Sequence, residues 1–117
     1  MGCPIKTLSI PNSVTNISSR YYYSMGDKYD GAFENCNKLT NIIIGDRIET
    51  IERETFRGCT SLTTVSFGER LALIDNDAFN GCNSVIDVYC YGTEEEGAGI
   101  TVYSGNDSIL NATIHYR

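Results

Sequence analysis

The segments AFENCNKLTNIIIGDRIETIERE (32–54), TFRGCTSLTTVSFGERLALIDND (55–77) and AFNGCNSVIDVYCYG (78–92) align at a spacing of 23 residues. Large apolar residues and cysteines recur in the same columns of this alignment: Phe33, Phe56 and Phe79; Cys36, Cys59 and Cys82; Leu39, Leu62 and Val85; Ile42, Val65 and Val88; Ile44, Phe67 and Cys90. A period in this range is typical of a solenoid, in which each unit buries its apolar residues only against neighbouring units. The repeat therefore predicts a stack of similar coils.

Each repeat contains signals for two strands and one turn. The pattern Leu39-x-x-Ile42-x-Ile44 ends in strand alternation, and Ile48-x-x-Ile51 supplies a second, shorter extended piece. A phenylalanine and a cysteine three residues apart then suit a 3₁₀ or single helical turn. Glycines follow the first strand, where we expect a corner that needs a residue without a Cβ: Gly45, Gly68 and Gly92. Corresponding strands of neighbouring coils should pair in parallel about 4.8 Å apart.

The repeat extends towards both ends of the chain. Ile5, Leu8, Ile10, Val14 and Ile17 precede their counterparts by 34 residues, eleven more than the repeat. The first coil therefore carries an insertion. We expect one domain with coils at approximately 1–31 (insertion 18–30), 32–54, 55–77 and 78–92, followed by a closing segment at 93–117. In that segment, SILNA (108–112) is expected to form a short helix and TIHYR (113–117) a last strand.

The repeat unit resembles the leucine-rich repeat, and more narrowly its bacterial surface-antigen (BspA-like) class. The resemblance rests on IPNSVTNI (10–17), on the AF-x-x-C-x-x-L pattern at 32–39, and on partial echoes at 55–62 and 78–85. It implies a leucine-rich repeat solenoid in an extracellular or cell-surface location. It also implies a non-enzymatic interaction module of a bacterial surface or secreted protein that binds host or neighbouring-cell macromolecules. The alternative function is a structural spacer within a longer protein, with no ligand of its own.

The composition restricts the classes of partner. The chain has 117 residues, 41% of them hydrophobic, and no apolar run approaches the ~20 residues that a membrane-spanning helix needs. We therefore expect no membrane insertion, and the N-terminal MGCPIKTLSIP lacks the pattern of a signal peptide. A formal net charge of −6 argues against nucleic acid as a partner.

The aligned cysteines predict neither a disulfide framework nor a metal site. Side chains stacked about 4.8 Å apart in one column point the same way, whereas a disulfide needs converging Cβ atoms about 3.8 Å apart. The spacing also lacks the C-x₂₋₄-C pair typical of zinc sites. We interpret Cys36, Cys59 and Cys82 as buried apolar thiols. Nothing in the sequence places His115, the only histidine, beside a thiol, so no catalytic residue and no cofactor is predicted.

Two surfaces are candidates for binding a protein or glycan. The first is the outward face of the main sheet, where the columns Ser9, Ile43, Ser66, Tyr89 and Thr7, Asn41, Thr64, Asp87 should lie; Ile43 and Tyr89 are its candidate contacts. The second is the insertion, with Tyr21, Tyr22, Tyr23 and Tyr29, because tyrosine is frequent at binding hot spots. These rings could instead pack over the first coil.

The exposed strand edge of the N-terminal coil is a third feature. A parallel stack leaves an unpaired edge at each end, and an uncovered edge favours pairing with another strand. The closing segment should cover the C-terminal edge. The N-terminal coil has no evident cap, so we expect that it could pair with a second copy of the chain in a homo-oligomer.

Overall fold

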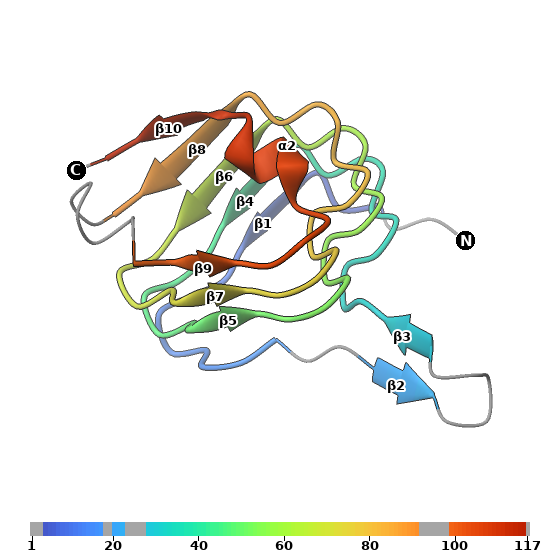
Figure 1. Cartoon of the computed structure of the whole chain (residues 1–117), viewed down its shortest axis with the longest axis horizontal. Helices are drawn as coiled ribbons and strands as arrows, with labels where there is room; N and C mark the ends of the chain where they lie inside the picture. The colour runs from blue at the N-terminus through green and yellow to red at the C-terminus, as the bar shows by residue number, and fades with distance from the viewer. Residues whose placement is uncertain (1–3, 18–19, 23–27, 92–98, 117) are drawn as a thin grey trace.

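A computed structural model describes residues 4–17, 20–22, 28–91 and 99–116. Two parallel sheets lie along two sides of a stack of coils (Figure 1). The main sheet has the order β1-β4-β6-β8-β10, and the smaller sheet has the order β5-β7-β9. The main strands are β1 (Thr7–Ser9), β4 (Asn41–Ile43), β6 (Thr64–Phe67), β8 (Asp87–Cys90) and β10 (Thr113–His115), and the smaller ones are β5 (Thr50–Ile51), β7 (Leu73–Ile74) and β9 (Thr101–Val102). The predicted solenoid of stacked parallel strands is confirmed.

The strand register follows the sequence columns. Leu8 lies beside Ile42, Ile42 beside Val65, and Val65 beside Val88. The last strand continues the same column, because Val88 lies beside Ile114. A one-residue slip would turn every inward side chain outward, so the buried apolar column fixes the register.

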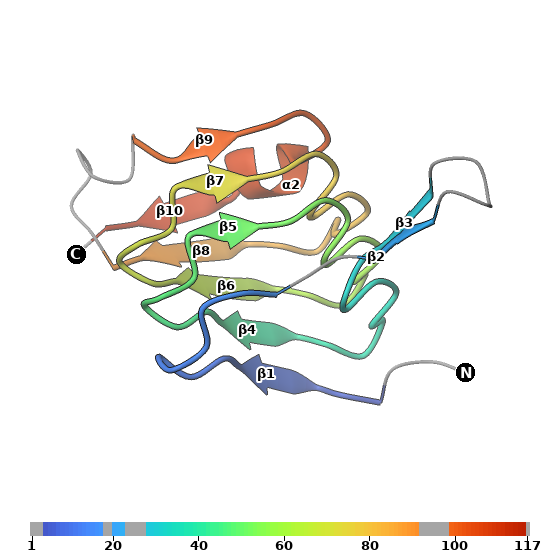
Figure 2. The ribbon, with the colours of Figure 1, turned by 90° about the horizontal axis from the view of Figure 1, so that it is seen from below.

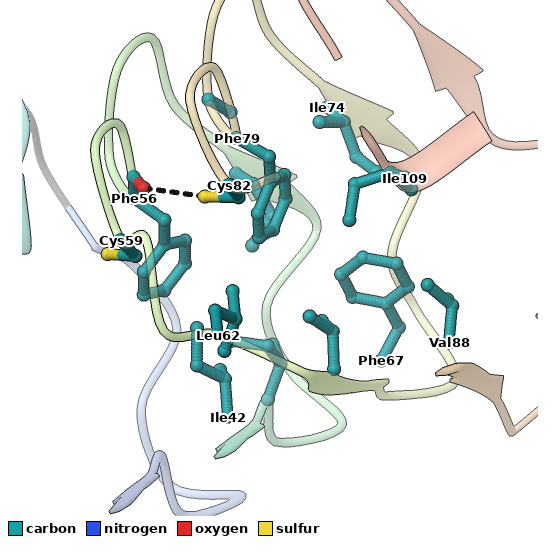
Figure 3. Packing of buried hydrophobic residues seen from close by; sticks show 14 of the residues in the cluster. Ile42, Phe56, Cys59, Leu62, Phe67, Ile74, Phe79, Cys82, Val88 and Ile109 are labelled. Atoms are coloured by element: carbon teal, nitrogen blue, oxygen red, sulfur yellow. Dashed lines mark hydrogen bonds between the residues drawn. The ribbon is translucent and has the colours of Figure 1, made fainter. Parts of the chain in front are cut away.

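The space between the two sheets holds the apolar core (Figure 3). Ile42, Val65 and Val88 from the main sheet are buried there, together with Ile74 from the smaller sheet. The core also contains Phe56 and Phe79 from the turn side, Phe67 at the end of β6, and Leu62. Like residues thus stack on like residues from coil to coil.

Single hydrogen-bonded turns connect the smaller sheet to the main sheet. Cys59 N–H donates to Phe56 O at 3.2 Å, and Cys82 N–H donates to Phe79 O at 3.1 Å. These i→i+3 bonds are those of a 3₁₀ turn, as expected, but they form separate turns and no continuous helix in these segments. The left-handed φ values of Gly58 (77°) and Gly81 (83°) let the chain reverse within each turn.

Close packing between coils, and not a special backbone conformation, requires glycine at the corners. Neither Gly45 nor Gly68 has a positive φ; instead, a Cβ on Gly45 would lie 2.6 Å from Ile10 O, and one on Gly68 would lie 2.4 Å from Gly45 O. Backbones of successive coils therefore touch at the corner and leave no room for a side chain. The register also places Tyr91, and not Gly92, after Cys90 in this column. Gly92 itself lies outside the described residues.

The closing segment completes the last coil and covers its end. Strand β9 extends the smaller sheet and β10 extends the main sheet, with helix α2 (Asp107–Leu110) between them (Figure 1). The predicted short helix and last strand are present, with the helix at Asp107–Leu110 and the strand at Thr113–His115. The buried Asn106 accepts the Phe79 N–H at 2.9 Å and donates to Asp75 O and Tyr103 O at 2.8 and 2.9 Å. Its side chain replaces contacts that a further coil would supply.

The insertion contains an antiparallel hairpin. Strand β2 (Arg20–Tyr22) pairs with β3 (Lys28–Asp30), with Tyr21 opposite Tyr29. Figures 1 and 2 both show this hairpin projecting beyond the stack on its turn side. The chain rejoins the stack at Gly31, where a Cβ would meet the backbone of Glu54 and Thr55. The eleven additional residues therefore leave the register of β1 against β4 intact.

Candidate functional site

The outward face of the main sheet carries the two predicted columns. Ser9, Ile43, Ser66 and Tyr89 are successive neighbours across the sheet, and so are Thr7, Asn41, Thr64 and Asp87. Ile43 is 40% exposed and Tyr89 is 41% exposed. Ser66 is only 9% exposed, because it is a small side chain between these two larger ones. The face is therefore uneven, with apolar groups standing above small polar ones.

Strand β10 adds His115 to this face, which the sequence did not predict. The imidazole stacks on the Tyr89 ring, with centroids 4.5 Å apart and planes 15° apart. His115 Nε2 also lies 2.9 Å from Asp87 Oδ1. The imidazole therefore contacts both the Asp87 carboxylate and the Tyr89 ring, and the stacking restricts the Tyr89 side chain. An ordered aromatic ring loses little conformational entropy when a partner binds.

Further exposed apolar side chains lie near the ends of β8, the strand that contains Tyr89. Tyr91, just after β8, is 49% exposed, and Ile86, just before it, is also exposed. Tyr91 lies beside Ile43 at the edge of the outward face and adds to the exposed apolar surface of Ile43 and Tyr89.

The tyrosines of the insertion occupy the hairpin strands. Tyr21 and Tyr22 lie in β2, and Tyr29 lies in β3. Tyr23 lies outside the described residues. Figure 2 shows the backbone of the hairpin projecting beyond the stack. Binding by these four residues remains a prediction.

The cysteine column forms part of the core. Cys36, Cys59, Cys82 and Cys90 are free thiols, and the first three are buried. Cys82 Sγ donates to Phe56 O at 3.1 Å (Figure 3), and Cys59 Sγ donates to Phe33 O at 3.4 Å. The neighbouring Cys82 thiol and burial raise the pKa of Cys59, and burial raises the pKa of Cys90. Because thiolate is the nucleophilic form of cysteine, these shifts make both residues poor nucleophiles.

Other classes of site have little support in the described part of the chain. Residues 4–17, 20–22, 28–91 and 99–116 contain no cluster of three or more His, Cys, Asp or Glu side chains suited to a metal ion. None of the helices in those residues is long and apolar enough to cross a membrane. His115 contacts a carboxylate and a phenol ring, which differs from a Cys–His nucleophile pair.

Comparison with known families agrees with this architecture. The BspA type leucine rich repeat region matches residues 1–96 and 28–115, with six copies. The chain belongs to this family. The resemblance of the repeat unit and the leucine-rich repeat fold are thus confirmed.

One solved structure is similar to this BspA-type repeat chain. It is a leucine rich cell surface protein from Faecalibacterium prausnitzii A2-165, with 27% sequence identity and a TM-score of 0.60. The match covers 92% of this chain and 28% of the other. The present repeats therefore correspond to about a quarter of that longer protein. No curated protein matches the chain.

Proposed function

We propose that this chain is a non-enzymatic interaction module of a bacterial cell-surface or secreted protein. It would bind a protein or glycan of a host or neighbouring cell through the outward face of its main sheet. The observation that carries the proposal is the ordered apolar surface formed by Ile43 and by Tyr89 stacked on His115. The similar protein from Faecalibacterium prausnitzii, described as a cell surface protein, supports the location.

The shape of this face favours a macromolecular partner. A small-molecule site is usually a concave pocket that encloses most of its ligand. Here the aromatic and apolar groups stand on a shallow sheet face beside small hydroxyl side chains. Exposed tyrosine is typical of protein contact surfaces, where aromatic residues are enriched. The alternative function is a structural spacer, which would not require an exposed apolar surface.

The proposal is tested by binding to immobilised extracellular-matrix proteins and purified bacterial surface glycans. We expect the unmodified chain to bind at least one of them, and Tyr89→Ala to weaken this binding by about tenfold, the effect of a modest hot spot. Tyr103→Ala is the matched control, because Tyr103 is similarly exposed but follows β9 of the smaller sheet. Equal binding by the unmodified chain and both variants would mean that the partner contacts another surface. If none of the three proteins binds, the structural spacer is the better interpretation.

The hairpin tyrosines need a separate experiment. Substituting Tyr21, Tyr22, Tyr23 and Tyr29 together by serine should weaken binding if the hairpin also contacts the partner. The hairpin lies outside the stacked sheets, so the thermal unfolding midpoint should change little (Figure 1). Unchanged binding would remove the insertion from the interface.

A further inference from the structure

A shallow groove of about 550 Å³ lies at the corner that follows the main sheet. Gly45 contributes to its floor, and Ile43, Asp46, Glu69 and Tyr91 are among the residues that line it. The groove adjoins the outward face described above, since Ile43 belongs to both.

Backbone contact between coils keeps the groove open. A Cβ on Gly45 would lie 2.6 Å from the carbonyl oxygens of both Ile10 and Pro11, and one on Gly68 would lie 2.4 Å from Gly45 O. The close approach of successive coils thus excludes side chains from this column. Tyr91, the next residue of the column, also lines the groove. Its ring is 49% exposed.

The walls of the groove combine apolar and acidic groups. Ile43 is exposed on the sheet side, while Asp46 and Glu69 occupy one column on the other side. Asp46 Oδ1 accepts the Glu69 N–H at 3.3 Å, and the Asp46 N–H donates to Asn12 Oδ1 at 2.9 Å. These contacts hold the Asp46 carboxylate against the Glu69 backbone and the Asp46 backbone against Asn12. Arg47 and Arg70 are exposed but do not line the groove.

This combination fits a cation carried on an aliphatic stem. The stem of an arginine or lysine can cover an apolar side chain such as Ile43 while its charged end remains polar. Its cation can lie against the Tyr91 ring and donate charge-assisted hydrogen bonds to carboxylate oxygens of Asp46 or Glu69. An anionic group would be repelled by the same carboxylates. We propose that the groove binds an arginine or lysine side chain of a protein partner.

The proposal rests on the proposed function and specifies its partner as a basic protein segment. Arginine is the better ligand, because its planar guanidinium can stack on an aromatic ring and bond a carboxylate with two N–H groups. A glycan without cationic groups would not use this subsite.

The test is a titration of the full ¹⁵N-labelled chain followed by amide chemical shifts. The probes are acetyl-Gly-Arg-Gly-amide and the same peptide with citrulline, a neutral analogue of similar shape. We expect saturable shifts at Gly45, Asp46 and Tyr91 with the arginine peptide, at a Kd on the order of millimolar. Citrulline should bind at least about fivefold more weakly, because it lacks the charge-assisted contact. Equal affinity for the two peptides, or the absence of shifts at these residues, would overturn the proposal.

Two variants locate the charge. Asp46→Asn keeps an acceptor for the Glu69 N–H, so the corner should remain folded, which an unchanged pattern of distant amide signals would verify. It should weaken arginine binding about threefold to tenfold. Glu49→Gln removes the same charge from an exposed residue at the smaller sheet and should leave binding unchanged. Equal losses in both variants would indicate unspecific attraction and contradict the proposal.

The outcome can be separated from that of the proposed function. If the chain shows Tyr89-dependent binding to a macromolecule but does not bind the arginine peptide, the proposed function stands and only the arginine subsite is excluded. A chain that binds the peptide at Tyr91 but none of the tested macromolecules retains the subsite and needs a different set of partners.

Discussion

The rings of Phe56 and Phe79 stack with their centroids 5.3 Å apart and their planes 18° apart. Phe33 continues the stack on the other side of Phe56, at 5.5 Å. Phe56 is therefore the middle ring of three, fully buried and in contact with a like residue from each neighbouring coil. The stability of the stack should depend strongly on this ring.

Phe56→Ala should lower the free energy of unfolding by about 3–5 kcal/mol, the usual range for a buried phenylalanine. Denaturant unfolding followed by circular dichroism measures the change. Phe33→Ala is the control, because Phe33 is only partly buried and has a phenylalanine on one side alone. A loss below about 1 kcal/mol for Phe56→Ala would contradict its place as a core ring.

Asn106→Ala should destabilise the C-terminal end by about 3 kcal/mol, because it leaves the Phe79 N–H and the Tyr103 carbonyl without the Asn106 side chain and removes one of the two hydrogen bonds to Asp75 O. Hydrogen exchange should show faster exchange at the Phe79 amide. Asn111→Ala is the control, since Asn111 is exposed nearby at the end of α2. Equal effects of the two substitutions would mean that the cap contributes little.

Two glycine substitutions separate close approach from backbone conformation. Gly68→Ala places a Cβ 2.4 Å from a backbone oxygen and should cost about 3 kcal/mol, as overpacking does. Gly81→Ala meets its nearest atom at 3.5 Å but requires a left-handed φ of 83°, which costs about 1–2 kcal/mol for an L-residue. Thermal and denaturant unfolding measure both. A larger loss of stability for Gly81→Ala than for Gly68→Ala would show that the spacing between coils adjusts easily at the corner.

The core thiols should resist alkylation in the native state. Cys59 and Cys82 are fully buried, and the pKa of Cys59 is raised by the neighbouring thiol and by burial. Iodoacetamide at pH 8 followed by mass spectrometry should therefore modify Cys59 and Cys82 only after denaturation, and the half-buried Cys90 should react before these two. Because the folded state disfavours the Cys59 thiolate, stability should also fall as pH rises above the ordinary thiol pKa. Rapid native modification of Cys59 would contradict its burial.

The N-terminal edge gives a prediction about self-association. Among the described residues, β1 pairs with β4 alone. Ile10 N–H donates to Ile43 O at 2.8 Å, so the alternate residue Ser9 directs its N–H away from β4. We expect concentration-dependent association in sedimentation velocity that Ser9→Pro abolishes and Ser9→Ala retains, since only proline removes the donor. Association that persists in Ser9→Pro would exclude this edge.

The repeat made most of the fold predictable from the sequence. The columns through Ile42 and Phe56 determined both the strand register and the identity of the core, because a parallel stack repeats each contact at a constant sequence spacing. The same periodicity predicted that Ile43 and Tyr89 share the outward face. It also predicted the thiol column, whose geometry excludes converging Cβ atoms.

Features that depart from the period were harder to predict. Val102 lies beside Ile74 at a spacing of 28 residues, so Asn106 could not be assigned a column from the 23-residue repeat. His115 joins Tyr89 for the same reason, because its strand follows at yet another spacing. The insertion was located by its length, but nothing in its composition specified a projecting hairpin. The acidic groove was missed because it depends on contact between coil backbones.

The hairpin of the first coil shows how this architecture tolerates added sequence. The eleven additional residues are inserted on the turn side, and β1 still pairs with β4 in the regular register. Foreign peptides grafted in place of the segment between β2 and β3 should therefore be displayed on a rigid support, with no effect on coil stacking. The first coil could serve as a presentation scaffold whose frame and loop can be engineered independently.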